Sequence, residues 1–175
     1  MLRYRMDYKN KELCRLRTIS FFLTLHKDKT QWEDALYSVK RDVDLLLPAV
    51  QKAGYTLQSI RVITNPFGEY LDLTNLQMAK ADLQYLTELL NKFNESGIRL
   101  RFAIGVARNK EEIALLPELI AAYGDLCNAC VNVPLDENGV LDNELIEQSV
   151  YAVQKIANIT PRGEGNFNFT VNFNC

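Results

Sequence analysis

The sequence predicts an α/β fold in which five parallel strands alternate with four helices. All the helices are expected on one face of the sheet, which makes the chain half of a larger α/β barrel. Five short segments alternate apolar and polar side chains, which is the period of a strand. Each of the first four is followed by a longer segment with apolar residues at spacings of three and four, which is typical of an amphipathic helix. One side of every predicted strand is polar, whereas strands covered by helices on both faces are almost continuously apolar.

The strand pattern is clearest at the end of the chain, in NFNFTVNFNC (166–175). There Phe167, Phe169, Val171 and Phe173 alternate with polar residues and are expected to face the helices. In the first strand Phe22 falls among the polar residues of the opposite face. The four earlier strands are predicted at residues 15–25, 57–64, 98–106 and 127–133.

Each predicted helix starts at a side chain that caps its first turn. The expected N-terminal caps are Thr30 with Glu33, Thr74 with Gln77, Asn109 with Glu112, and Asp142. Gly54 and Gly124 are expected to end the first and third helices. Pro48 should bend the first helix and Pro117 should split the third, because proline removes a backbone donor and clashes with the preceding turn.

Length and charge limit the classes of function. A chain of 175 residues, 47% hydrophobic, is one domain or a piece of one. We divide it into an N-terminal extension, residues 1–14, and a single α/β domain, residues 15–175. The net charge is −2 with no basic or acidic block, so neither nucleic acid nor a membrane is an expected partner.

The N-terminus lacks the apolar core of a signal peptide, and no run approaches the ~18 apolar residues of a membrane span. The four cysteines are too few and too scattered for a disulfide scaffold. We therefore expect a soluble cytoplasmic protein with free thiols.

The polar face of the predicted sheet indicates a barrel with a wide interior. Right-handed crossovers that add every strand on the same side place all the helices on one face, and the sheet then curls around the other. The inner face would carry Thr18, Ser20, Thr24, Arg61, Arg99, Arg101, Gly105, Asn128, Cys130, Asn132, Asn168, Thr170 and Asn172. Five strands cannot close such a barrel, and open edges promote aggregation. We therefore expect a missing C-terminal half or, as the alternative, a homodimer.

Four phrases stand in order along the chain: RTI (17–19), SIRVITNPF (59–67), IRLRFAIGVARNKEEIALLPELI (98–120) and GEGNFNFTVNF (163–173). Together they resemble the uncharacterised family known as domain of unknown function 711, over residues 15–175. Members are much longer, so the resemblance implies an N-terminal fragment. It also implies a fold similar to the ten-stranded barrel of glycyl radical enzymes, which is built from two five-stranded halves. It implies no activity, because the family has none established. Radical chemistry does not carry over, since the glycine loop would lie in the missing part and the chain has no adjacent cysteine pair.

Ligands of parallel α/β folds bind beyond the carboxyl ends of the strands, and here those ends are rich in amides. The candidate ligand-binding residues are Asn65, Arg61, Arg99, Arg101, Arg108, Asn132 and Asn172. The asparagines are alternatively caps of turns, which is the favoured interpretation. The inward arginines bind either a phosphate or carboxylate ligand or, as we favour, carboxylates of the missing half.

Residue type alone offers three catalytic candidates: His26, Glu164 and Cys175. His26 and Cys175 would form a nucleophile pair only within hydrogen-bond reach of each other, and Glu164 is a candidate general base. Cys127 and Cys130 resemble a metal or redox pair, but their spacing places them on opposite faces of one strand. We therefore predict no metal site, and no pattern identifies a cofactor.

Two functions remain open. The first is an enzyme that acts on a small polar or anionic molecule bound at the carboxyl ends of the strands. The alternative is a non-enzymatic module for small-molecule sensing or for assembly.

Overall fold

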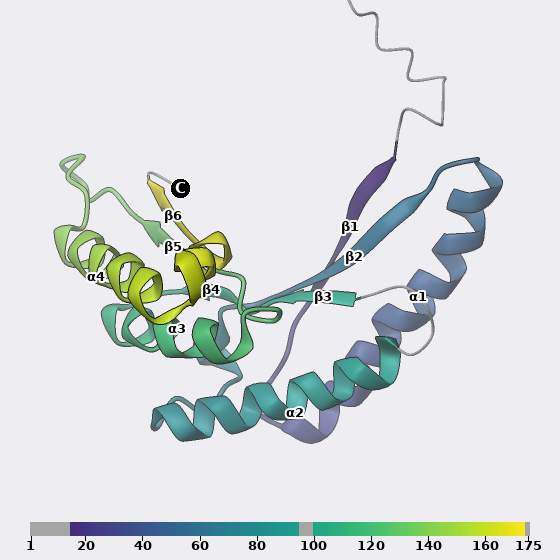
Figure 1. The fold of residues 1–175 in the computed structure, drawn as a ribbon, viewed down its shortest axis with the longest axis horizontal. Coiled ribbons are helices and arrows are strands. Elements are labelled where there is room, and N and C mark those ends of the chain that lie inside the picture. The colour runs from purple at the N-terminus through teal and green to yellow at the C-terminus, as the bar shows by residue number, and fades with distance from the viewer. Residues whose placement is uncertain (1–14, 95–99, 174–175) are drawn as a thin grey trace, which may run out of the picture.

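The computed structural model describes residues 15–94 and 100–173, and it consists of two three-stranded parallel sheets with helices outside them (Figure 1). The first sheet has the order β1-β2-β3 and the second β4-β5-β6. The strands are β1 (Leu16–Leu23), β2 (Leu57–Thr64), β3 (Leu100–Ala103), β4 (Gly105–Ala107), β5 (Ala129–Val133) and β6 (Phe169–Phe173). All four strand pairings are parallel, which confirms the predicted βα repeat.

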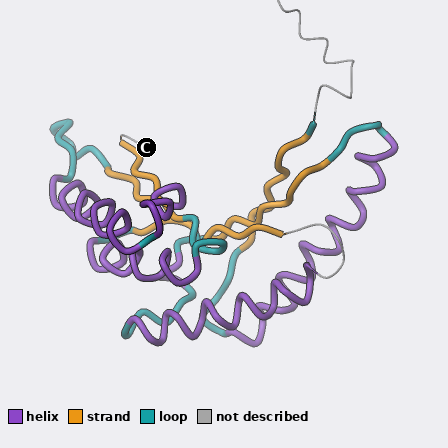
Figure 2. The backbone as a smooth tube through the Cα atoms, in the orientation of Figure 1, coloured by secondary structure: helices purple, strands orange, loops and turns teal. Residues whose placement is uncertain are grey.

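Four α-helices connect the strands, together with short 3-10 segments. The α-helices are α1 (Trp32–Lys52), α2 (Leu76–Asn94), α3 (Lys110–Tyr123) and α4 (Asn143–Ile159), and the 3-10 segments are η1 (Lys29–Gln31), η2 (Phe67–Glu69) and η3 (Pro161–Asn168). Figure 2 shows α1 and α2 along the outside of the first sheet and α3 and α4 along the outside of the second. The described chain is thus an open curved shell without a closed barrel, as half of a barrel requires.

The predicted strand at 98–106 is broken in two at its middle. β3 pairs with β2, whereas β4 pairs with β5. Between them, Ile104 donates its backbone N–H to the carbonyl of Asn128 (3.0 Å). Gly105 has φ +85°, and a Cβ there would lie 2.5 Å from the carbonyl oxygen of Asn65. Only glycine tolerates both the nearby Asn65 carbonyl and this φ, so the break in the strand depends on this one residue.

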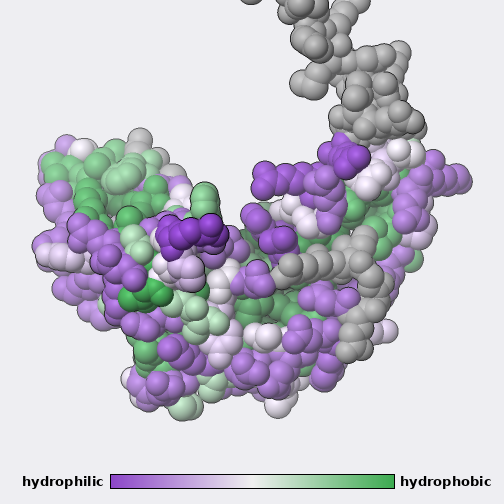
Figure 3. Space-filling model, viewed as in Figure 1, coloured by the Kyte–Doolittle hydropathy of each residue, from purple (hydrophilic) through white to green (hydrophobic). Residues whose placement is uncertain are grey.

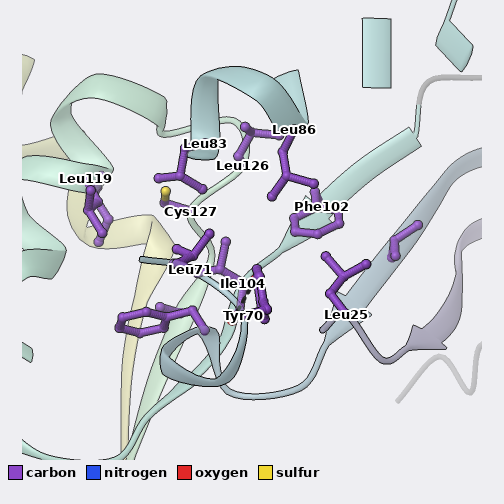
Figure 4. Close-up of a cluster of buried hydrophobic side chains, with 14 of the residues drawn as sticks. Leu25, Tyr70, Leu71, Leu83, Leu86, Phe102, Ile104, Leu119, Leu126 and Cys127 are labelled. Carbon is purple, nitrogen blue, oxygen red and sulfur yellow. Dashed lines mark hydrogen bonds between the residues drawn. The ribbon is translucent and has the colours of Figure 1, made fainter. Parts of the chain in front are cut away.

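A continuous buried cluster underlies both sheets (Figure 4). Ile104 and Tyr70 lie at its centre, and both are essentially inaccessible to solvent. The Tyr70 hydroxyl lies 2.9 Å from Oγ1 of Thr64 and 3.3 Å from the carbonyl oxygen of Ile104, while burial raises the pKa of Tyr70. Trp32 packs edge-on against Tyr70 at a centroid distance of 5.8 Å. The junction of the sheets is therefore fixed by both packing and hydrogen bonds.

Some predicted element boundaries are wrong by a few residues. The last strand starts at Phe169 rather than at 166, because residues 161–168 form η3. Phe167 therefore does not join the buried face, and its side chain is 88% exposed. Both α1 and α3 also continue through their prolines, so Pro117 does not split the third helix.

Two of the four predicted caps differ from the structure. Asp28 caps η1, ahead of α1, by accepting from the N–H of Thr30 (3.1 Å), while Gln31 at the N-cap of α1 makes no side-chain cap hydrogen bond. Asn75 replaces Thr74 ahead of α2 by accepting from the N–H of Met78 (3.0 Å). Asn109 and Asp142 cap α3 and α4 as expected. Asp and Asn compete with a neighbouring Thr for the cap because their side chains reach the same donors and are preferred there.

No helix in the described part of the chain has the length and apolar character needed to cross a membrane.

Replacing Gly105 by alanine is expected to destabilise the fold by about 3 kcal/mol or more, because the new Cβ adds steric conflict to an unfavourable φ. Gly139→Ala is the matched control, since Gly139 has φ +76° but nothing within 4 Å of its Cβ site. That variant should cost about 1 kcal/mol. Urea unfolding of both variants measures the difference, and equal losses would contradict the close approach at Gly105.

Candidate functional site

Two arginines lie side by side on the concave face of the first sheet, and a third lines the same hollow. Arg61 on β2 pairs in register with Arg101 on β3, and Ser20 on β1 pairs with Arg61. Neighbouring strands are ~4.8 Å apart, so the two arginines start side by side on one face. Together with Arg17 they line a hollow of about 290 Å³. We call Arg17, Arg61 and Arg101 the arginine cluster.

The same cluster borders a larger hollow of about 630 Å³ that reaches the second half of the shell. Asp125, Asn128, Glu164 and Phe167 also line it. Figure 3 shows the surface hollowed between the two halves of the molecule, with hydrophilic residues gathered along it. This hollow therefore joins the first sheet to the segments that precede β5 and β6, namely the end of α3, the loop after it and η3.

The charges of the arginine cluster have no partner within the described residues. None of the three guanidinium groups takes part in an ion pair there. Nε of Arg61 is buried and makes no hydrogen bond to any described residue. Glu164 borders the larger hollow, but it binds Arg162 (2.6 Å). A buried donor without an acceptor destabilises the folded protein, so binding an anion at Arg61 would be favourable.

The polar side chains at the carboxyl end of the first sheet bind one another and the backbone, so they are not free to bind a ligand. The Asn65 amide accepts from the N–H of Leu25 (2.9 Å) and donates to the Leu25 carbonyl (3.1 Å) and to Glu69 (2.8 Å). Its amide donors are thereby fully used. Arg108 binds the other oxygen of Glu69 (2.7 Å). Asn65 and Arg108 thus meet through Glu69, and they hold β1, β2 and β4 together at their ends.

The other predicted site residues lie elsewhere. Asn172 donates to Asn132 (3.0 Å) at the exposed carboxyl end of the second sheet. His26 is exposed and lines a separate hollow of about 370 Å³ beside Trp32, whereas Glu164 borders the concave hollow. The structure therefore does not bring His26 and Glu164 together. Arg99 and Cys175 lie outside the described residues.

Sequence reasoning missed the position of two residues that line these hollows, Arg17 and Phe167, and it placed Phe22 on the polar face without making it a site candidate. Arg17 precedes the alternating part of the first strand, and the alternation would place it on the side that faces the helices. Phe22 was visible as an aromatic side chain on a polar face, and its side chain is 82% exposed. Phe167 sits in η3, where the strand pattern does not apply.

The two central cysteines have different environments. Cys127 is buried in the core, and burial raises the pKa of its thiol. Cys130 is half-buried and lines a hollow on the concave side with Phe22. Among the described residues no three side chains of metal-ligating type lie close enough together to hold a metal ion.

Asn65→Ala should destabilise the protein by about 2 kcal/mol, because it leaves the backbone groups of buried Leu25 without their amide partner. Asn172→Ala, which removes the exposed contact to Asn132, should cost less than about 0.5 kcal/mol. Thermal or urea unfolding checks both values. Similar stabilities for the two variants would show that Asn65 is not structural.

Comparison with protein families identifies the chain. Residues 8–175 match a family described as Uncharacterised ACR (DUF711). Comparison with the curated proteins finds no match. The family match spans almost the whole chain, including both sheets, the arginine cluster and η3. The chain therefore belongs to the uncharacterised DUF711 family.

Proposed function

We propose that this protein binds a small anionic molecule on its concave face, and that this face is one wall of the active site of a cytoplasmic enzyme. The observation that carries the proposal is the arginine cluster, which has no ion-pair partner among residues 15–94 and 100–173, and in which Nε of Arg61 is buried with no acceptor from those residues. This position differs from the carboxyl-end site expected from the sequence, because the polar groups at those ends already bind one another.

The chemistry of the cluster favours a carboxylate or phosphate. A guanidinium group is always charged and presents a planar fork of donors that matches both anions. Arg61 and Arg101 lie on adjacent strands, so their like charges repel until an anion lies between them. Oγ1 of Thr18 and Oγ of Ser59, 2.9 Å apart on the same wall, add hydroxyl groups beside the cluster.

The described residues at this hollow include several groups that can bind an anion but few that can react with it. Glu164 is the catalytic candidate that borders the hollow of the arginine cluster. In this proposal the remaining reactive groups come from the other half of the barrel, contributed by further chain or by a second copy.

The second candidate is the assembly module. β1 and β6 each pair on one side only within the described residues, so both ends of the shell are available to another polypeptide. Carboxylates of that polypeptide would then neutralise the arginine cluster, and no ligand would be needed.

Calorimetric titration of the chain with pyrophosphate and with citrate tests anion binding. Arg61→Gln and Arg101→Gln should each weaken binding by about tenfold or more, because each removes a charge-assisted hydrogen bond. Arg41→Gln is the matched control, since it removes the same charge from the outer face of α1, where Arg41 is 68% exposed. This control should change affinity by less than about twofold.

Equal effects of the three substitutions would contradict a defined site, because they would indicate only a general loss of positive charge. The assembly module makes a different prediction. Light scattering would then show self-association that salt and Arg61→Gln both weaken, with no binding of either anion.

A further inference from the structure

Two phenylalanines are the most exposed large apolar side chains of the described chain, and both border the concave surface. Phe22 is 82% exposed and Phe167 is 88% exposed. They come from distant elements, β1 and η3, yet they line one hollow of about 420 Å³. Single exposed apolar side chains are common, but two aromatic rings that border one hollow indicate a binding surface.

The aromatic pair adjoins the arginine cluster. Ser20 pairs with Arg61, and Phe22 pairs with Ile63, two residues further along both strands. Side chains two residues apart share a face and are ~7 Å apart, so Phe22 follows the cluster along the same wall. Arg61 and Phe167 each line both this hollow and the larger polar one.

Hydrogen bonds tie the segment before Phe167 to α4. The hydroxyl of Thr160 donates to the carbonyl of Ile156 (2.6 Å) and accepts from the N–H of Gly165 (3.1 Å). The Asn166 amide donates to the carbonyl of Val153 (3.2 Å). These bonds fix the backbone just before Phe167 relative to α4, and the exposed ring projects from this segment.

The lining of this hollow combines a cationic group with apolar side chains, and it also includes the polar residues Thr64, Asn128, Asn168 and Thr170. Ile63, Val106 and Ala129 contribute to its lining beside the two rings, while Arg61 stands at its border with the arginine cluster. Figure 3 shows hydrophobic residues beside hydrophilic ones where the surface is hollowed. A purely polar ligand would leave the rings in water, and a neutral apolar ligand would leave the guanidinium groups unpaired.

We infer that the ligand is an aromatic anion, in which one ring carries a phosphate or carboxylate group. The anionic group binds the arginine cluster and the ring packs against Phe22 and Phe167. This inference rests on the proposed function, because it takes the arginine cluster as the anion site. The volume of the apolar hollow, about 420 Å³, suits a single substituted ring.

Two pairs of probes with equal charge test the inference: methyl phosphate against phenyl phosphate, and acetate against phenylacetate. The aromatic member of each pair should bind about tenfold more tightly, which corresponds to ~1.4 kcal/mol of aromatic packing. Comparing the two aromatic probes then distinguishes a phosphate ligand from a carboxylate ligand. Calorimetry or ligand-observed NMR on the whole chain measures all four affinities.

Phe22→Ala and Phe167→Ala should remove the preference for the aromatic probe and leave the affinity for the methyl probe unchanged. Arg61→Gln should weaken both members of each pair. Tyr37→Ala is the matched control, because Tyr37 is an aromatic residue of α1 that is 62% exposed on another surface. It should retain the full preference. All the substituted rings are exposed, so the melting temperatures of these variants should stay close to that of the parent.

Equal affinities within each pair, or a preference that survives Phe22→Ala and Phe167→Ala together, would overturn the inference and leave the proposed function standing. Failure of all four probes to bind would instead contradict the proposed function. Self-association that Phe22→Ala abolishes would show that a second copy covers the rings, and it would also overturn the inference.

Discussion

The close approach of the end of β2 to Gly105 is the constraint on which the rest of the shell depends. The carbonyls of Thr64 and Asn65 occupy the space where a side chain at 105 would begin. The chain can therefore turn at this point and pass from pairing with β2 to pairing with β5. Tyr70 and Ile104 fill the region beneath the turn, so the curvature is supported by the core. This turn therefore joins the two sheets of the shell.

Hydrogen-bond satisfaction separates the structural polar residues of this face from the candidate functional ones. Asn65 uses its side-chain carbonyl and both amide hydrogens to hold the ends of the first sheet. This is the structural role, shaping a turn, that is common for an asparagine after a strand. Asn132 and Asn172 bind each other. Arg61 lies on β2, which Asn65 follows, but its buried Nε has no acceptor in the part of the chain that the structure describes. The paired side chains at the ends of the strands are therefore structural, and the arginine cluster is the better candidate for the site.

Much of the fold could be predicted from the sequence, because alternating polarity reports which face of a strand is buried. Arg61 and Arg101 were correctly expected on one face for this reason. The break at Gly105 could not be predicted in the same way, since the alternation from Leu100 to Val106 continues through it and only the approach of β2, a distant segment, requires glycine. The position of Phe167 was wrong because the alternating pattern extends three residues into η3. Tertiary contacts overrode local pattern at both points. The likeness to glycyl radical enzyme barrels stays a prediction of the family resemblance.

The open shell also determines how strongly the arginine cluster can act. In the described chain the hollow faces water, where the attraction between a guanidinium group and an anion is weakened by the high dielectric constant. Closing the barrel would remove water from both the cluster and the phenyl rings, which would strengthen the ionic contact and bury the apolar surface. Where no carboxylate of the closing half reaches the cluster, an anion would therefore bind the closed barrel more tightly than the shell alone. By the same reasoning, carboxylates on the closing half would gain as much as a ligand does, so the arginine cluster can bind either a ligand or the closing half, but not both at once.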